Sequence, residues 1–217
     1  MPAEFNRQVV PDPVLRFVRA CQARARCHLG GGAALSGAFL GHRLSRDVDL
    51  MCHEKADMRR LAQLIGEAAA EAGGTAQIVQ DAGSFVRASL SLPSHALEVD
   101  LVFEATGDLE PPTTVEGVLV ESLADLRAAK LTCVLSRSEP RDLVDLLFLD
   151  RAGFPPERDL SLALRKDAGI DPRVLGWLLG QFPTEPLPRM LVPLSVEELE
   201  EFRDALRERI RAATVPP

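Results

Sequence analysis

The segment HLGGGAALSGAFLGHRLSRDVDL, residues 28–50, constrains the fold more than any other part of the sequence. The end of this segment and the two residues after it, RLSRDVDLMC, residues 43–52, have the partial alternation of a strand, and side chains two apart in a strand point to the same face. Asp47 and Asp49 are therefore expected side by side. Two carboxylates about 5 Å apart repel by roughly 3 kcal/mol at an effective dielectric constant of about 20. The pair predicts a bound cation, and carboxylate oxygens are ligands that Mg²⁺ prefers.

The glycines at the start of this segment predict a phosphate site beside the cation. A strand that enters a glycine turn and continues as a helix presents backbone N–H groups and the positive end of the helix dipole. Gly31 and Gly32 would let phosphates approach the backbone without a Cβ. Glycine turns are common, and the Asp-x-Asp pattern alone fits a solvated sheet face equally well. The order of turn, helix and acidic strand within about 20 residues favours the joint site.

A third carboxylate is expected from the segment ALEVDLVF, residues 96–103. Its apolar residues alternate with Glu98 and Asp100, which predicts a strand with one apolar and one polar face. Aspartate has a low strand propensity, so Asp100 in mid-strand indicates a role beyond solubility. We expect Asp100 to complete the metal site, with Glu98 as the weaker candidate.

Hydrophobic periodicity over the rest of the chain predicts a mixed α+β fold. The 217 residues suggest one domain, residues 1–153, followed by a C-terminal helical appendage, residues 154–217. Turns between three successive strands are too short for anything but antiparallel pairing. The expected strands are 75–80, 84–92 and 96–103, besides a short one at 28–30. The expected helices are 13–26, 57–72, 122–137, 139–153 and 195–213, the last with a capping box of Ser195 and Glu198.

Composition and charge exclude several classes of protein. The chain is 46% hydrophobic and 26% charged, and no apolar run approaches the ~18 residues that a membrane helix needs. The first residues lack the pattern of a secretory signal, so we expect a cytoplasmic protein without a membrane partner. The net charge of −7 means that contact with nucleic acid would require a local basic patch.

The cysteine pattern predicts free thiols. Four cysteines form no C-x-x-C pair, and disulfides are not favoured without export. The dipeptides Cys27-His28 and Cys52-His53 could suggest zinc, but adjacent ligands do not match the usual zinc spacings. We therefore expect no metal on cysteine or histidine.

The opening segment resembles the motif that begins the DNA polymerase β-type nucleotidyltransferase fold. It is most similar to the AbiEii/AbiGii (MenT-like) toxin nucleotidyltransferases, whose signature runs GG-x-A-L and then R-x-S-x-D-x-D. The positions in register are Gly31, Gly32, Ala34, Leu35, Arg43, Ser45, Asp47 and Asp49. A single strand aspartate, a K-L-x5-R stretch and an R-D-x-x-D-L helix follow in such families. They are matched by Asp100, Lys130, Leu131, Arg137, Arg141, Asp142, Asp145 and Leu146.

This resemblance implies a polymerase β-like fold with a mixed sheet flanked by helices. It implies an enzyme that uses Mg²⁺, or alternatively Mn²⁺, to transfer a nucleoside monophosphate from an NTP. By the same resemblance, the acceptor would be the 3′ end of tRNA, and the chain would be a toxin with a cognate antitoxin. The metal ligands would be Asp47, Asp49 and Asp100, which also count among the catalytic residues with Lys130 and Asp142. The nucleotide-binding residues would be Gly31, Gly32, Ser36, Ser45, Lys130 and Arg137.

Three alternatives stay open at this point. Lys130 and Arg137 lie about two helical turns apart and share a face, so they could instead form an interhelical ion-pair network with Asp142 and Asp145. The acceptor could be a small molecule or a protein side chain, which the net negative charge favours. The chain could also be a catalytically inactive nucleotide-binding module, although all three metal carboxylates are present.

Overall fold

The computed structural model describes residues 4–213, which form two compact units that divide after Ser122. The boundary predicted from the sequence lay after residue 153 instead. The difference arises because the helices between residues 123 and 151 pack with later helices: α4, Leu123–Ser136, contacts α6, and α5, Pro140–Arg151, contacts α8. A functional boundary after residue 153 stays a prediction. No helix within residues 4–213 is both long enough and apolar enough to cross a bilayer.

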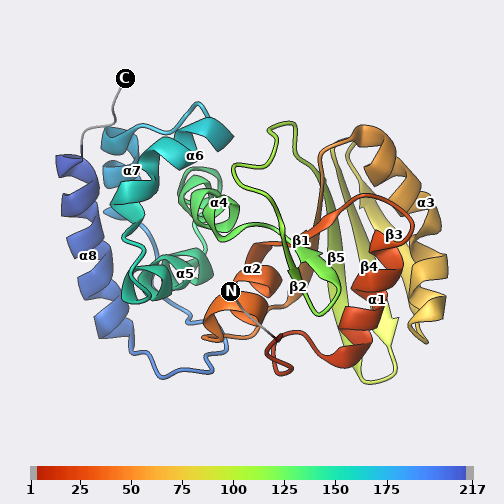
Figure 1. Ribbon diagram of the computed structural model, residues 1–217. Helices are drawn as coiled ribbons and strands as arrows, with labels where there is room; N and C mark the ends of the chain where they lie inside the picture. The colour runs from red at the N-terminus through yellow and green to blue at the C-terminus, as the bar shows by residue number, and fades with distance from the viewer. Residues whose placement is uncertain (1–3, 214–217) are drawn as a thin grey trace. The chain divides into compact units, whose positions relative to one another are not determined.

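The N-terminal unit is a mixed sheet with helices on it, which confirms the predicted fold class. Its strands are β1 His28–Gly30, β2 Asp47–Cys52, β3 Thr75–Asp81, β4 Phe85–Leu92, β5 His95–Phe103, β6 Thr113–Val115 and β7 Val118–Val120. Their order is β3-β4-β5-β2-β1-β7-β6, with β2 parallel to β5 and β1 parallel to β7. The acidic strand β2 is therefore central, and Figure 1 shows it between β1 and β5.

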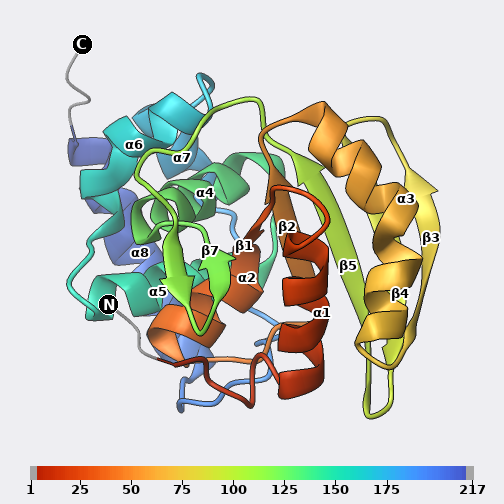
Figure 2. The ribbon, with the colours of Figure 1, turned by 45° about the vertical axis from the view of Figure 1, so that its right-hand side comes forward.

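Two amphipathic helices cover one face of this sheet. Helix α1, Asp12–Gln22, and helix α3, Lys55–Glu71, pack against each other, and α3 also contacts β3, β4 and β5. Figure 2 shows both helices in front of the strands. Their apolar stripes bury residues such as Leu15, Phe17 and Leu61 against inward-facing strand residues such as Leu50 and Leu101. Helix α1 ends four residues earlier than predicted.

The sequence analysis missed the hairpin of β6 and β7. Its two turn residues, Glu116 and Gly117, both have positive φ, of 47° and 77°, as a tight two-residue hairpin turn requires. Arg7 donates to the Glu116 carboxylate at 2.8 and 3.0 Å, and Arg19 donates to its carbonyl at 2.7 and 3.1 Å. The sequence signal was present as Val-Glu-Gly-Val between β-branched residues, and it is weak because each strand has only three residues.

The C-terminal unit is helical throughout its described residues. After α4 and α5 come the short 3₁₀ helix η2, Pro156–Asp159, then α6 Leu160–Lys166, α7 Pro172–Leu179 and α8 Val196–Ala212. The predicted capping box at the start of α8 is confirmed by reciprocal bonds between Ser195 and Glu198. The predicted apolar stripe of α8 is buried and faces α5 and α7, with Leu199, Phe202, Leu206 and Ile210 as its members.

Candidate active site

The glycine turn lies directly against the second aspartate of β2. Strand β1 ends at Gly30, and the chain continues as α2, Gly31–Ala34, and the π-helix η1, Leu35–Leu40. Gly31 has a φ of 60°, and a Cβ there would overlap the Asp49 carboxylate. A Cβ on Gly32 would come within 2.7 Å of the Arg43 Nη2 and 3.0 Å of the Ser45 Oγ. Glycine is therefore required for the close approach of this turn to Asp49, Arg43 and Ser45, and its role in phosphate binding stays a prediction.

The acidic residues predicted as metal ligands share one face of the sheet. In the parallel pairing of β2 with β5, Asp47 is opposite Glu98, and Asp49 is opposite Asp100. Side chains in register on neighbouring strands point to the same face, so the pairing brings Asp49 and Asp100 together. Residues on the other face of β2, such as Val48 and Leu50, are buried in the core. The positions of the carboxylates are thus fixed by strands whose opposite face is packed in the core.

Arg87 on β4 joins this acidic face, and the sequence analysis missed it. Its Nε and Nη2 donate to the two oxygens of Asp100 at 2.8 Å each, and its Nη1 lies 3.4 Å from Glu98. The hydrogen bonds to Asp100, against some loss of hydration, raise the pKa of Arg87 above its usual range. A carboxylate that accepts a bidentate arginine keeps further lone pairs, so Asp100 stays able to bind a cation. Arg87 holds it in one orientation.

The two predicted serines lie in different surroundings. Ser45 lies just before β2. Its hydroxyl donates to Asp47 at 3.1 Å and lies beside Gly32, so it contacts both the acidic strand and the glycine turn. Ser36 is fully buried: its hydroxyl donates to the Arg43 carbonyl at 2.6 Å and accepts from the Arg43 N–H at 3.2 Å. Ser36 therefore ties η1 to the segment before β2. The predicted role of Ser36 in nucleotide binding stays a prediction.

The predicted residues of the C-terminal unit form a buried ion-pair network between α4 and α5. Lys130 Nζ lies 3.1 Å from Asp142 and 2.7 Å from Asp145, and the side chains of both aspartates are fully buried. Arg137 donates to the two oxygens of Asp142 at 2.8 and 2.9 Å, and its side chain is 39% exposed. This is the interhelical arrangement that the sequence analysis kept as an alternative. Roles of these residues in nucleotide binding stay predictions.

Opposing effects act on the ionisation of this network. Burial raises the pKa of Asp142, but Lys130 and Arg137 lower it by more, so its pKa lies below the usual value. Burial likewise lowers the pKa of Arg137, and its bonds to Asp142 outweigh that effect and raise it. Both groups are therefore charged at neutral pH.

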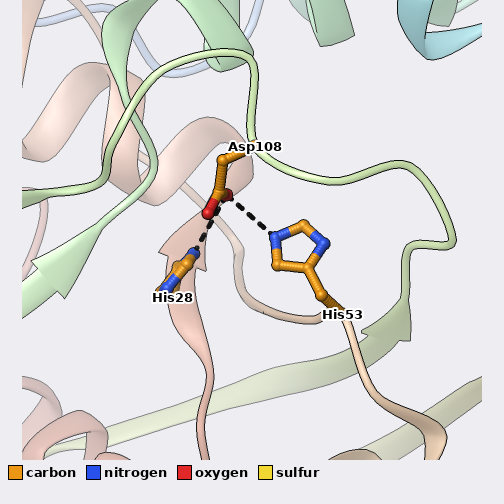
Figure 3. Close-up of side chains that lie close together, drawn as sticks. All are labelled: His28, His53 and Asp108. Carbon is orange, nitrogen blue, oxygen red and sulfur yellow. Dashed lines mark hydrogen bonds and ion pairs between the residues drawn. The ribbon is translucent and has the colours of Figure 1, made fainter.

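A second cluster of metal-ligand types was missed by the sequence analysis. His28 on β1, His53 just after β2 and Asp108 in the loop after β5 place one ligand atom each within 4.8 Å of one another (Figure 3). Spacing along the chain does not reveal this cluster, because the antiparallel pairing of β1 with β2 is what brings the two histidines together. The two Cys-His dipeptides were the sequence feature that pointed to these histidines. Only the register of β1 with β2 shows that the two histidines lie close together.

Comparisons with known proteins identify the family and the fold. A family model described as nucleotidyl transferase AbiEii toxin, type IV toxin–antitoxin system, matches residues 16–215. A putative nucleotidyltransferase from H. pylori and JHP933 from Helicobacter pylori are each 22% identical with a TM-score of 0.58. Each similarity covers 91% of this chain; it covers 91% of the first Helicobacter chain and 88% of the second. The MenT4 nucleotidyltransferase toxin from Mycobacterium tuberculosis H37Rv is 14% identical with a TM-score of 0.60, over 94% of this chain and 85% of that one. The comparison with curated proteins gives no match.

Proposed function

The chain belongs to the nucleotidyl transferase AbiEii toxin family of type IV toxin–antitoxin systems, and from this premise we propose that it transfers a nucleoside monophosphate from an NTP to the 3′ end of tRNA. The observation that carries the proposal is the contact between the left-handed Gly31 and Asp49, with Asp100 beside it in register. A glycine turn of the kind that can bind phosphates thus lies against a set of carboxylates.

The carboxylates fit a divalent cation by their chemistry. Asp47, Asp49 and Asp100 offer only oxygen donors, which Mg²⁺ prefers and Mn²⁺ accepts. These three residues would hold the ion. When bound, a divalent ion of this kind offsets the negative charge of the NTP phosphates and of the transition state.

The residues of the N-terminal unit supply the remaining steps. Backbone N–H groups of Gly31 and Gly32, at the start of a helical segment, bind the phosphates, and Ser45 orients Asp47 through its 3.1 Å bond. Asp100, held by Arg87, accepts the proton of the acceptor hydroxyl as that oxygen attacks the α-phosphate. The new bond joins the acceptor oxygen to the α-phosphorus. The bond from the α-phosphorus to the oxygen that bridges to the β-phosphate breaks, and pyrophosphate leaves.

We assign the cations of the C-terminal unit to the triphosphate. Arg137 is the stronger candidate because its side chain is more than one-third exposed, and its planar guanidinium suits phosphate oxygens. Lys130 is nearly buried between Asp142 and Asp145, so its contribution is a fixed positive charge. Asp142 acts by fixing both cations. This assignment rests on the order of family motifs along the chain and on the chemistry of the side chains.

The family, which belongs to type IV toxin–antitoxin systems, implies an antitoxin partner. A tRNA acceptor would have to bind a chain with a net charge of −7, so contact would require a local basic patch. The same charge favours the alternative acceptors, a small molecule or a protein side chain. The cytoplasmic location expected from the sequence also stays a prediction.

The acceptor is tested by incubating the protein with Mg²⁺, each α-labelled NTP in turn and a cell extract. Label is then followed into RNA, protein and small-molecule fractions. The proposal predicts label in tRNA, released by removal of the 3′-terminal nucleotide, with transfer that declines steeply as salt increases. Label in protein or in small molecules alone would overturn the tRNA acceptor and keep the transferase. Absence of transfer from all four NTPs would contradict the catalytic proposal itself.

A further inference from the structure

The cluster of His28, His53 and Asp108 lies outside the carboxylate site described above. His28 is paired with Met51 across β1 and β2, and Asp49 is paired with Gly30, so the cluster begins two residues further along these strands. His53 follows the end of β2, and Asp108 belongs to the loop between β5 and β6. The cluster therefore joins three segments that are distant in sequence, all within the N-terminal unit.

The distances in this cluster suit a metal ion bound by nitrogen and oxygen. Asp108 Oδ1 lies 2.9 Å from His53 Nε2 and 3.5 Å from His28 Nδ1, and Figure 3 shows both rings turned toward this oxygen. Ligand atoms about 2.1 Å from a tetrahedral ion are about 3.4 Å apart, which is within this range. The side chains are 13%, 24% and 29% exposed for His28, His53 and Asp108, so an ion can enter and water can complete its coordination.

A second observation concerns the orientation of His53. Its other ring nitrogen, Nδ1, lies 3.2 Å from the Glu104 carbonyl. A carbonyl can only accept, so Nδ1 carries the proton and donates it. In the neutral ring this leaves the lone pair on Nε2, the atom that faces Asp108. A histidine held through its second nitrogen by a backbone carbonyl is the usual arrangement at metal sites, because it fixes both tautomer and ring orientation.

The neighbouring cysteines are excluded as ligands by strand geometry. Cys27 and Cys52 each precede a histidine of the cluster, and adjacent strand residues point to opposite faces. Both cysteines are buried on the core side. The donor set is therefore two imidazoles and one carboxylate. Imidazole suits Zn²⁺ and its first-row neighbours, whereas Mg²⁺ prefers an all-oxygen set.

We propose that His28, His53 and Asp108 form a binding site for a divalent transition-metal ion of the zinc class, separate from the carboxylate site. The bound ion fastens the loop that carries Asp108 to the ends of β1 and β2. These are the strands that carry Gly30 and Asp49, so the site supports the framework of the active site without taking part in transfer.

Co²⁺ is the direct probe of this site, because its visible absorption reports tetrahedral or five-coordinate nitrogen ligation. The full chain is freed of metal and titrated with Co²⁺ in excess Mg²⁺, which occupies carboxylate sites. One equivalent of Co²⁺ should bind with visible bands, and Zn²⁺ should displace it. His53→Gln and Asp108→Asn should each bind Co²⁺ at least tenfold more weakly. His95→Gln, a histidine outside the cluster, should bind like the wild type, as should Asp49→Asn.

The proposal is overturned if the wild type gives no visible bands at one equivalent, as expected if the cluster is only an imidazole–carboxylate ion pair. It is overturned equally if His53→Gln and His95→Gln behave alike. Far-ultraviolet circular dichroism of every variant verifies folding, and Asp108→Asn, in an exposed loop, keeps the test valid if a strand-end histidine variant unfolds. Because the readout is metal absorption, a failure here is distinguishable from a failure of the transferase proposal.

Discussion

At the residue scale, the candidate site depends on the absence of a side chain. Gly31 combines a left-handed backbone with a position where a Cβ would overlap the Asp49 carboxylate. Either feature alone would favour glycine. Together they mean that a side chain at residue 31 would disturb both the glycine turn and the position of Asp49. Arg87 has the complementary role, because its bidentate pairing fixes Asp100 beside Asp49. The geometry of the carboxylates is therefore controlled by their neighbours as much as by β2 itself.

Gly31→Ala tests this coupling. The new Cβ must displace the Asp49 carboxylate or the turn, and a displacement of about 1 Å at a reacting centre costs about 100-fold in kcat. The left-handed backbone adds about 1–3 kcal/mol of destabilisation. Transfer assays and thermal unfolding measure the two effects separately.

Gly66→Ala is the matched control for this variant. Gly66 is exposed in the middle of α3, and a Cβ there meets no atom within 4 Å. Alanine in a helix interior should raise the free energy of unfolding by about 0.5–1 kcal/mol and leave transfer unchanged. Equal activity of the two alanine variants would contradict the role assigned to Gly31.

At the scale of elements, α4 and α5 are joined by charges that are buried. Asp142 on α5 pairs with Lys130 on α4 and with Arg137, the residue that follows the end of α4. Asp145, three residues further along α5, pairs with the same Lys130. Such a network tolerates the loss of a partner poorly, because the remaining charge stays buried. The ion pairs of Lys130 and Arg137 with Asp142 and Asp145 thus account for the charged residues of these two motifs without reference to a substrate.

Asp142→Asn should lower the free energy of unfolding by about 3 kcal/mol at pH 7. The pKa of Asp142 in the folded chain lies below its usual value of about 3.9, so its stabilising effect is complete above that value. The effect is lost as pH falls through the lowered pKa. The difference between wild type and variant should therefore be constant from pH 7 to about pH 5 and shrink below about pH 4.

Denaturant unfolding as a function of pH measures this difference. Asp204→Asn serves as control, because the Asp204 side chain on α8 is 62% exposed and its pair with Arg203 should contribute less than about 0.5 kcal/mol. A difference for Asp142→Asn that grew on acidification would show that the sign assigned to its pKa shift is incorrect.

How well the sequence predicts the pairing of these strands depends on how far apart they lie along the chain. The strands β3, β4 and β5 lie within one residue of their predicted bounds, and their antiparallel pairing is confirmed. The tight turn between Leu92 and His95 even fixes Arg87 opposite Asp100, so the missed arginine was predictable from the register. In contrast, β2 pairs in parallel with β5 across about fifty residues, and the approach of Asp49 to Asp100 has no local signal.

At the scale of the whole molecule, the chain contains a mixed-sheet unit with the metal-site carboxylates and a helical unit with the ion pairs of Lys130 and Arg137. The motif resemblance indicated the family, and the family match over residues 16–215 extends beyond the motif residues on both sides. Helices after residue 153 were expected as an appendage, whereas they pack with α4 and α5. Helical periodicity predicts each of these helices and cannot predict which of them share a core.

The central claim is that Asp49 belongs to a metal-dependent nucleotidyltransferase site, and single-turnover transfer of α-labelled nucleotide in Mg²⁺ tests it most directly. Asp49→Asn preserves size and removes the charge, so transfer should fall by about 100- to 1000-fold while the circular dichroism spectrum stays unchanged. Asp81→Asn, at an exposed aspartate on β3 paired with Arg59, should transfer at the wild-type rate. Transfer by Asp49→Asn at the wild-type rate would contradict the account.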